Sequence, residues 1–125
     1  MFHDIPMLFN EHYIYIMASK SGTLYVGSTS NIISRVYEHK QKLVEGFTKK
    51  YGCVRLLYYE ILKTKQESLI RELQIKKYNR KKKEELINKL NPKWEDLAWD
   101  WYIDLLVTQP LIHRKGIPRR SSSGL

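Results

Sequence analysis

Two short stretches near the start of the chain are apolar or alternate between apolar and polar side chains, as β-strands do. Residues 13–17 and 23–27 are rich in tyrosine, isoleucine and valine, which favour strands. Residues 20–22, Lys-Ser-Gly, lie between them and are typical of a turn. The two stretches therefore predict a β-hairpin.

Helical spacing of apolar positions follows the hairpin. Residues 28–31 offer N-cap candidates, and Ile32, Val36 and Leu43 then fall on one stripe at about 100° per residue. This pattern predicts a helix that runs to about residue 43. After a polar, basic loop, residues 54–62 are rich in leucine, isoleucine and tyrosine, and they predict a third strand.

Capping signals predict two further helices. Thr64 and Glu67 have the spacing of a capping box, which predicts a helix from there to about residue 78. Asn79 is an N-cap candidate for the next helix, which should end before the Asn-Pro pair at residues 91–92.

The chain beyond this pair keeps helical spacing for a short distance and then loses its periodicity. Trp94, Leu97, Ala98, Trp101 and Leu105 recur at helical intervals, which predicts a short helix docked by its indoles. We therefore expect four parts: an irregular lead (1–11), a folded domain (12–97), a helical extension (98–107) and a flexible basic tail (108–125).

The net charge points to a class of partner. The 125 residues suffice for one domain, and 22 Lys and Arg against 13 Asp and Glu give a formal net charge of +9. Such a surface attracts polyanions, of which nucleic acid is the commonest. The alternative is that the charge serves solubility alone.

Cysteine content and hydropathy exclude several classes of protein. The one cysteine, Cys53, rules out a disulfide framework and a zinc site made of thiolates. The first residues lack the basic and apolar regions of a signal peptide, and no apolar run approaches ~20 residues. We therefore expect a cytoplasmic protein without a membrane partner.

The predicted hairpin places tyrosines beside a glycine. Side chains alternate along a strand, so Tyr13 and Tyr15 share one face, and Tyr25 shares a face with Gly27. A glycine inside a strand usually marks a close approach by backbone or ligand, so two phenols beside it can form a reactive pocket. The hairpin taken alone favours the simpler interpretation that these residues are good strand formers.

Three polar residues occupy unusual positions on the predicted helices. Arg35 and His39 are i,i+4 neighbours at the edge of the apolar stripe, and Glu72 falls between Leu69 and Ile75. A carboxylate among apolar neighbours needs a cation, either a partner such as Arg35 or a metal ion. Taken singly, a surface ion pair, a half-buried imidazole and a structural salt bridge stay open as explanations.

Taken together, these residues resemble the GIY-YIG nuclease family, in particular its small single-domain bacterial members, which are related to the N-terminal domain of the excision-repair nuclease. Residues 13–15 stand at the GIY motif and residues 25–27 at the YIG motif, although Tyr13 replaces the first glycine. Further similar segments are residues 34–39 with Arg35 and His39, 44–52, 70–76 with Glu72, and 90–92 with Asn91. The resemblance covers about residues 12–97, and nothing after Leu97 has a counterpart.

The resemblance implies a fold and a reaction. The fold would be α/β, more narrowly α+β, with a small three-stranded antiparallel sheet flanked by helices, which agrees with the predicted order of elements. The reaction would be endonucleolytic hydrolysis of phosphodiester bonds, dependent on one divalent metal, Mg²⁺ or Mn²⁺. The implied catalytic residues are Tyr15, Tyr25, Arg35, His39, Glu72 and Asn91.

The implied roles suit the chemistry of these side chains. Glu72 would hold the metal, and Arg35 would contact the scissile phosphate. Tyr15 would be the general base, but a free phenol has a pKa of ~10 and would need help from the metal, Arg35 or His39. Whether Tyr15 or His39 accepts the proton stays open. Tyr25 would position the water or the phosphate.

Other residues would orient or bind the nucleic acid. Asn91 would orient a ligand by hydrogen bonding. Contacts to the nucleic acid are expected from Gly27, Lys49, Lys50, Arg80, Lys81, Lys82 and Lys83. Basic side chains position the backbone without reading bases, so low sequence specificity is expected. The alternative for the basic run is a solvated helix face, because two glutamates follow it.

Two other function classes stay open. One is a nucleic-acid-binding module on a catalytically weak or inactive nuclease fold. The other is an interaction protein that uses the aromatic cluster of Trp94, Trp99, Trp101 and Tyr102. DNA is the expected substrate, but the sequence leaves open RNA, the strandedness, the oligomeric state and the biological setting, whether repair, restriction, mobility or uptake.

Overall fold

The computed structural model describes residues 11–41 and 52–103 of the chain. Its elements are the strands β1 (His12–Ala18), β2 (Leu24–Thr29) and β3 (Arg55–Leu62), and the helices α1 (Ile32–Lys40), α3 (Lys65–Lys76) and α4 (Arg80–Leu90). No helix in these ranges is long and apolar enough to cross a lipid bilayer. Residues 1–10 of the expected lead (1–11), Lys49, Lys50 and the expected basic tail lie outside the described residues.

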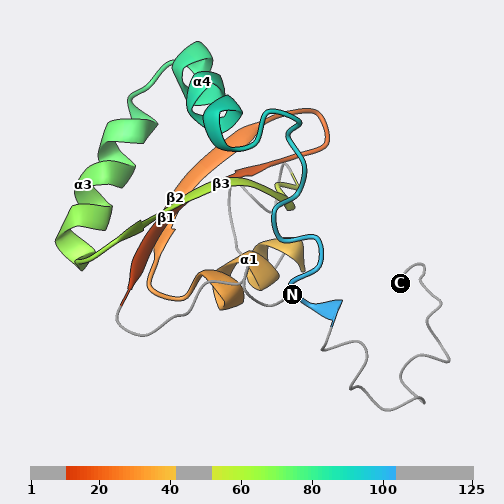
Figure 1. Ribbon diagram of the computed structural model, residues 1–125, viewed down its shortest axis with the longest axis horizontal. Helices are drawn as coiled ribbons and strands as arrows, with labels where there is room; N and C mark the ends of the chain where they lie inside the picture. Colours follow the sequence, from red (N-terminus) through yellow and green to blue (C-terminus); the bar gives the residue numbers. More distant parts are fainter. Residues whose placement is uncertain (1–10, 42–51, 104–125) are drawn as a thin grey trace, which may run out of the picture.

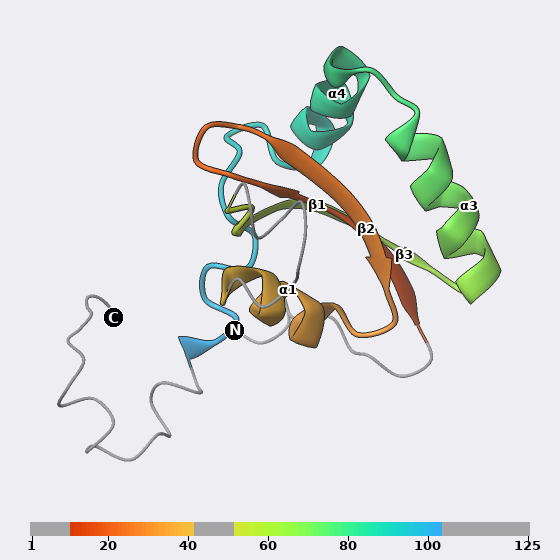
Figure 2. The same cartoon turned by 180° about the vertical axis from the view of Figure 1, so that it is seen from behind.

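The three strands form one antiparallel sheet in the order β2-β1-β3, so the predicted hairpin and fold class are confirmed. Helix α1 lies on one face of this sheet, and α3 and α4 lie on the other (Figures 1 and 2). Tyr15 of the central strand is opposite Gly27 of β2 and Tyr59 of β3. Strand β2 is therefore an edge strand of the sheet, with Tyr25 partly buried and Val26 and Gly27 buried.

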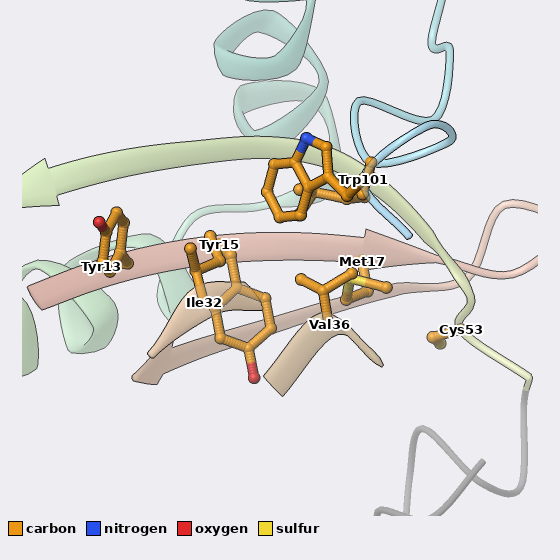
Figure 3. Close-up of a cluster of buried hydrophobic side chains, with 9 residues drawn as sticks. Tyr13, Tyr15, Met17, Ile32, Val36, Cys53 and Trp101 are labelled. Carbon is orange, nitrogen blue, oxygen red and sulfur yellow. The ribbon is translucent and has the colours of Figure 1, made fainter. Parts of the chain in front are cut away.

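Apolar side chains form a separate cluster on each face of the sheet. The cluster beneath α1 contains Tyr13, Tyr15, Met17, Ile32, Val36, Cys53, Leu56, Ala98 and Trp101 (Figure 3). The cluster beneath α3 and α4 contains Ile14, Ile16, Ala18, Val26, Leu57, Tyr58, Ile75 and Ile87. The alternating side chains of β1 therefore supply both cores, and Tyr15 is anchored within the first.

A β-bulge in β3 changes which face its side chains occupy. Ile16 pairs with Tyr58 but Met17 pairs with Leu56, so Leu57 is an extra residue. As a result Leu57 and Tyr58 both enter the cluster beneath α3 and α4, whereas Leu56 enters the cluster beneath α1. The bulge explains why these three consecutive residues are all buried.

The helices begin at the predicted capping residues. The side chains of Asn31, Thr64 and Asn79 each accept a hydrogen bond from a backbone N–H three residues on, at 3.0, 3.1 and 2.8 Å. Glu67 reaches back as a capping box requires, although its Oε1 accepts from the backbone N–H of Lys63 at 3.2 Å. Helix α1 ends at Lys40, slightly earlier than predicted.

The helix predicted from the spacing after Pro92 is wrong over Trp94–Tyr102, because residues 94–96 have no regular secondary structure and residues 97–102 form turns. Trp94 has a positive φ of 55°, which interrupts helical backbone. The backbone then bonds to the edge of β3, because the N–H of Leu97 donates to the carbonyl of Leu56 at 2.8 Å. The indole of Trp101 still packs into the core, as the sequence predicted.

Candidate active site at the β1–β2 hairpin

Tyr15, Tyr25 and His39 form a compact aromatic group between the sheet and α1. The hydroxyl of Tyr15 and Nε2 of His39 are 2.9 Å apart and share a buried hydrogen bond. The ring of Tyr25 lies 6.2 Å from that of Tyr15 and 5.3 Å from that of His39, between centroids. The structure thus brings together three of the predicted catalytic residues from β1, β2 and α1.

Gly27 is the residue that allows this grouping. A Cβ atom at Gly27 would lie 2.6 Å from Tyr15 Oη and 2.9 Å from Tyr25 Cε2. Contacts this short do not occur between real side chains, so only glycine fits beneath the two phenols. The predicted close approach at Gly27 is therefore an approach by Tyr15 and Tyr25.

Burial keeps both partners of the central hydrogen bond uncharged. Burial raises the pKa of Tyr15 well above its ordinary value. Tyr25 and the negative charge of Glu72 raise this pKa further, whereas the positive charge of Arg35 lowers it. Burial, together with the positive charge of Arg35, lowers the pKa of His39 to about 4. At neutral pH the pair is therefore a phenol and a neutral imidazole, whose Nε2 can accept the phenolic proton.

The second ring nitrogen of His39 has no hydrogen-bond partner among the described residues. Nδ1 is buried, although the neutral ring must either donate or accept there. Buried polar atoms without partners are rare in folded proteins, and each calls for an explanation. This observation supports a role for His39 beyond packing.

Arg35 lies close enough to this group for its charge to act on Tyr15 and His39. Its guanidinium pairs with Glu38 on the same helix at 3.5 Å, and its side chain is 40% exposed. A pair this exposed contributes little to stability and is readily exchanged for a stronger anion. The guanidinium of Arg35 can therefore exchange Glu38 for another anion.

Glu72 is held at the edge strand by two partners that the sequence did not predict. Its Oε1 accepts a hydrogen bond from the hydroxyl of Ser28 at 2.6 Å, and its Oε2 pairs with the ammonium of Lys76 at 2.6 Å. The cation that the apolar setting of Glu72 required is thus Lys76, and Arg35 does not provide it. Two local signals existed: Ser28 follows the motif glycine, and Lys76 is at i+4 from Glu72.

The residues present fit a weakly held, hard divalent ion. The described residues contain no group of three or more His, Cys, Asp or Glu side chains that could hold a metal. A metal at Glu72 would therefore take its other ligands from water and substrate oxygens, which suits Mg²⁺ or Mn²⁺. The carboxylate is only 15% exposed, so its orientation is fixed by its surroundings.

Asn91 does not contact the other predicted catalytic residues. Its amide donates to the backbone carbonyls of Leu57 and Glu95 at 3.1 and 2.7 Å, and its Oδ1 accepts from the N–H of Glu95 at 3.1 Å. These bonds tie the end of α4 to β3. They support a structural role, so the ligand-orienting role of Asn91 stays a prediction without a supporting contact.

The basic run at the start of α4 is divided between structural and exposed side chains. Arg80 donates to the carbonyl of Gly22 at 2.6 Å and to Glu84 at 2.7 Å, so it links α4 to the hairpin turn. The ammonium of Lys82 lies 4.4 Å from the ring centroid of Tyr78. Lys81 is exposed and Lys83 is half-buried, which leaves Lys81 as the freest candidate for a phosphate contact.

Comparisons with known proteins agree with the family suggested by the motifs. A model of the GIY-YIG catalytic domain matches residues 11–88. A UPF0213 protein of Staphylococcus saprophyticus is 40% identical over 79 residues, which cover 63% of this chain and 96% of that relative. A UPF0213 protein of Staphylococcus aureus is 38% identical over 78 residues, covering 62% and 95%.

A solved structure is also similar to this chain. The solution NMR structure of a UPF0213 protein from Bacillus halodurans has 27% sequence identity, covers 72% of this chain and 95% of that chain, and gives a TM-score of 0.47.

The matched domain carries general implications. A GIY-YIG catalytic domain is typical of nucleases and implies nucleic-acid binding, and nucleases of this type generally depend on a divalent metal. The family model spans more than half of the chain and includes both motif strands, α1 and α3. On these grounds the chain belongs to the GIY-YIG family.

Proposed function

We propose that this protein is a metal-dependent endonuclease that hydrolyses phosphodiester bonds of DNA with low sequence specificity. The observation that carries the proposal is the arrangement around Gly27 and Ser28. On one side of the edge strand, Gly27 accommodates the hydrogen-bonded pair Tyr15–His39, and on the other Ser28 holds Glu72. A proton acceptor and a carboxylate for a metal thus lie on the two sides of one edge strand.

The first chemical task is to remove a proton from the attacking water. Tyr15 would accept it while passing its own phenolic proton to Nε2 of His39, 2.9 Å away. This relay avoids a free phenolate, which burial at Tyr15 makes unfavourable, but it places the proton on His39, whose pKa burial and Arg35 lower to about 4. The imidazolium is therefore a transient carrier of the proton. Tyr25, in contact with both rings, would position the water or the phosphate.

The second task is to stabilise the charge that develops on the phosphate. Arg35 would exchange its exposed pair with Glu38 for a charge-assisted bond to a phosphate oxygen. Glu72, oriented by Ser28, would hold the divalent metal. When bound, the metal supplies Lewis-acid stabilisation of the phosphate and leaving oxygens.

The test is cleavage of a panel of single-stranded DNA, double-stranded DNA and RNA with Mg²⁺ or Mn²⁺. We expect metal-dependent cleavage of DNA, reduced about 10²–10⁴-fold in Tyr15→Phe, the range of general-base catalysis. Glu72→Gln should reduce cleavage to a similar or larger extent. Tyr13→Phe is a matched control, because Tyr13 lies on the same face of β1 but its hydroxyl donates to Glu11.

Two outcomes would redirect the interpretation. Full cleavage by Glu72→Gln would overturn the proposed metal site. A wild-type protein that binds DNA but leaves every substrate intact with both metals would instead be a nucleic-acid-binding module on this fold.

A further inference from the structure

Both oxygens of the Glu72 carboxylate are already occupied by groups of this chain. Ser28 donates to Oε1 at 2.6 Å, and the ammonium of Lys76 lies 2.6 Å from Oε2. Ser28 reaches from the edge strand β2, whereas Lys76 lies one helical turn beyond Glu72 on α3. The carboxylate is thus held by one partner from the sheet and one from its own helix.

These two partners differ in how easily they can leave. The Ser28 side chain is short and fixed to a strand, so its bond orients the carboxylate. The Lys76 side chain is 48% exposed and has a flexible four-carbon stem, against 15% exposure for Glu72. Ion pairs between a helical residue and its i+4 neighbour are weak in contact with solvent, so the ammonium can leave Oε2 at little expense.

A cation at Oε2 matters because a metal ion would need this carboxylate. An ammonium and a divalent ion on the same oxygen repel each other, so their binding is competitive. A lysine displaced from Oε2 stays within the length of its side chain from the carboxylate. It is then a free cation beside the place where a substrate phosphate would meet the metal.

We propose that Lys76 is a displaceable cation of the active site. It occupies Glu72 Oε2 in the metal-free protein, gives up that oxygen to the divalent ion, and then binds a phosphate oxygen of the nucleic acid. This inference rests on the proposed function, because it takes Glu72 as the metal ligand. It assigns Lys76 two opposite effects, weaker metal binding without substrate and tighter substrate binding with metal.

The first effect is measured without any catalysis. Mn²⁺ is titrated into ¹⁵N-labelled protein, and the paramagnetic broadening of the amide signals around Ser28 and Glu72 gives its affinity. Lys76→Met should bind Mn²⁺ about two- to fivefold more tightly than the wild type, the factor expected for the loss of a weak competing ion pair. Lys77→Met is the matched control, because Lys77, the C-cap residue of α3, is also exposed but lies about 100° further around the helix axis.

The second effect is measured by cleavage kinetics at saturating metal. Lys76→Met should raise KM by about threefold or more, as expected for a lost phosphate contact, while Lys77→Met should not. Equal Mn²⁺ affinities for the wild type and Lys76→Met would overturn the displacement. An equal rise of KM in both variants would overturn the specific phosphate contact and leave only general charge.

Glu72→Gln separates this inference from the proposed function. If Glu72→Gln binds Mn²⁺ as the wild type does, Glu72 is not the ligand and the proposed metal site fails. If it loses Mn²⁺ binding while Lys76→Met is unchanged, only the role of Lys76 fails. The ¹⁵N spectra from the same titration verify that each variant is folded.

Discussion

Gly27 sets the spacing of the two site phenols, and this dependence can be tested with one methyl group. Gly27→Ala would place its Cβ 2.6 Å from Tyr15 Oη and 2.7 Å from Tyr15 Cζ. Because Tyr15 is packed in the core, the clash should reduce the free energy of unfolding by about 1–3 kcal/mol. It should also displace the Tyr15 hydroxyl from His39 and reduce cleavage more than the loss of folded protein explains.

The control for Gly27→Ala is Val26→Ala, next to it on β2 but in the core beneath α3 and α4. It destabilises by leaving a cavity and does not touch the phenols. Urea unfolding and cleavage rates, measured at a temperature where both variants are folded, separate the two effects. Equal cleavage by both variants would contradict the proposed role of Gly27.

His39 makes the stability of the protein depend on pH. Its pKa is about 4 in the folded protein, lowered by burial and by Arg35, against ~6.5 in an unfolded chain. Between these values the unfolded state binds a proton that the folded state does not. The contribution is therefore fully present above pH ~6.5 and is lost as the pH falls towards 4, by on the order of 3 kcal/mol.

Urea unfolding of the wild type and His39→Gln from pH 8 to pH 4.5 measures this contribution. The difference in unfolding free energy between the two proteins should stay constant above pH ~6.5 and shift in favour of His39→Gln below it. Parallel pH dependences of the two proteins would show that His39 titrates normally in the folded state.

At the scale of elements, the sequence predicts the features that depend on neighbouring residues and misses those that depend on distant ones. The caps at Asn31, Thr64 and Asn79 were predictable, because a cap bonds to a group three residues away. The segment from Trp94 to Tyr102 has helical spacing but forms irregular structure and turns, because it bonds to β3, some forty residues earlier. Its conformation is decided by a distant strand, which periodicity does not report.

The candidate site divides in the same way. The motif residues Tyr15, His39 and Glu72 could be identified from order and spacing. Their contacts, including the bonds of Ser28 and Lys76 to Glu72, depend on how β2 meets α3 in space. The bond of Asn91 to Leu57 likewise joins residues far apart in the chain, so the sequence does not report it, and the ligand-orienting role of Asn91 stays a prediction.

Of the two tryptophans in the turns at residues 97–102, only Trp101 should contribute to stability. Trp101 is 5% exposed within the core beneath α1, whereas Trp99 is 70% exposed. Trp101→Ala should therefore destabilise by about 3–5 kcal/mol. Trp99→Ala should stay within about 0.5 kcal/mol of the wild type, as surface substitutions usually do.

Thermal or urea unfolding of both variants measures this difference. A large loss in Trp99→Ala would mean that its ring is packed in solution. Normal cleavage by Trp99→Ala would show that this exposed indole is not needed for the reaction.

At the scale of the whole molecule, the net charge of +9 should give strongly salt-dependent binding of nucleic acid. The basic residues of α4 do not contribute alike, because Arg80 bonds to Gly22 and Glu84 whereas Lys81 is exposed. Lys81→Ala should lower the slope of log K against log salt by about 0.9 on double-stranded DNA, because one phosphate contact releases about that many counterions. Its stability should be unchanged.

Arg80→Ala should show the opposite pattern if its bonds are structural. Losing the link between α4 and the hairpin turn should reduce the free energy of unfolding by about 1 kcal/mol, with a smaller change of the salt slope than Lys81→Ala gives. Fluorescence anisotropy on a labelled duplex from 50 to 200 mM salt, beside urea unfolding, measures both quantities. Arg80→Ala could instead show a larger decrease of the salt slope than Lys81→Ala and keep the stability of the wild type. In that case Arg80 leaves its partners Gly22 and Glu84 to bind phosphate. Helix α4 then contacts the nucleic acid through its first residue rather than through Lys81.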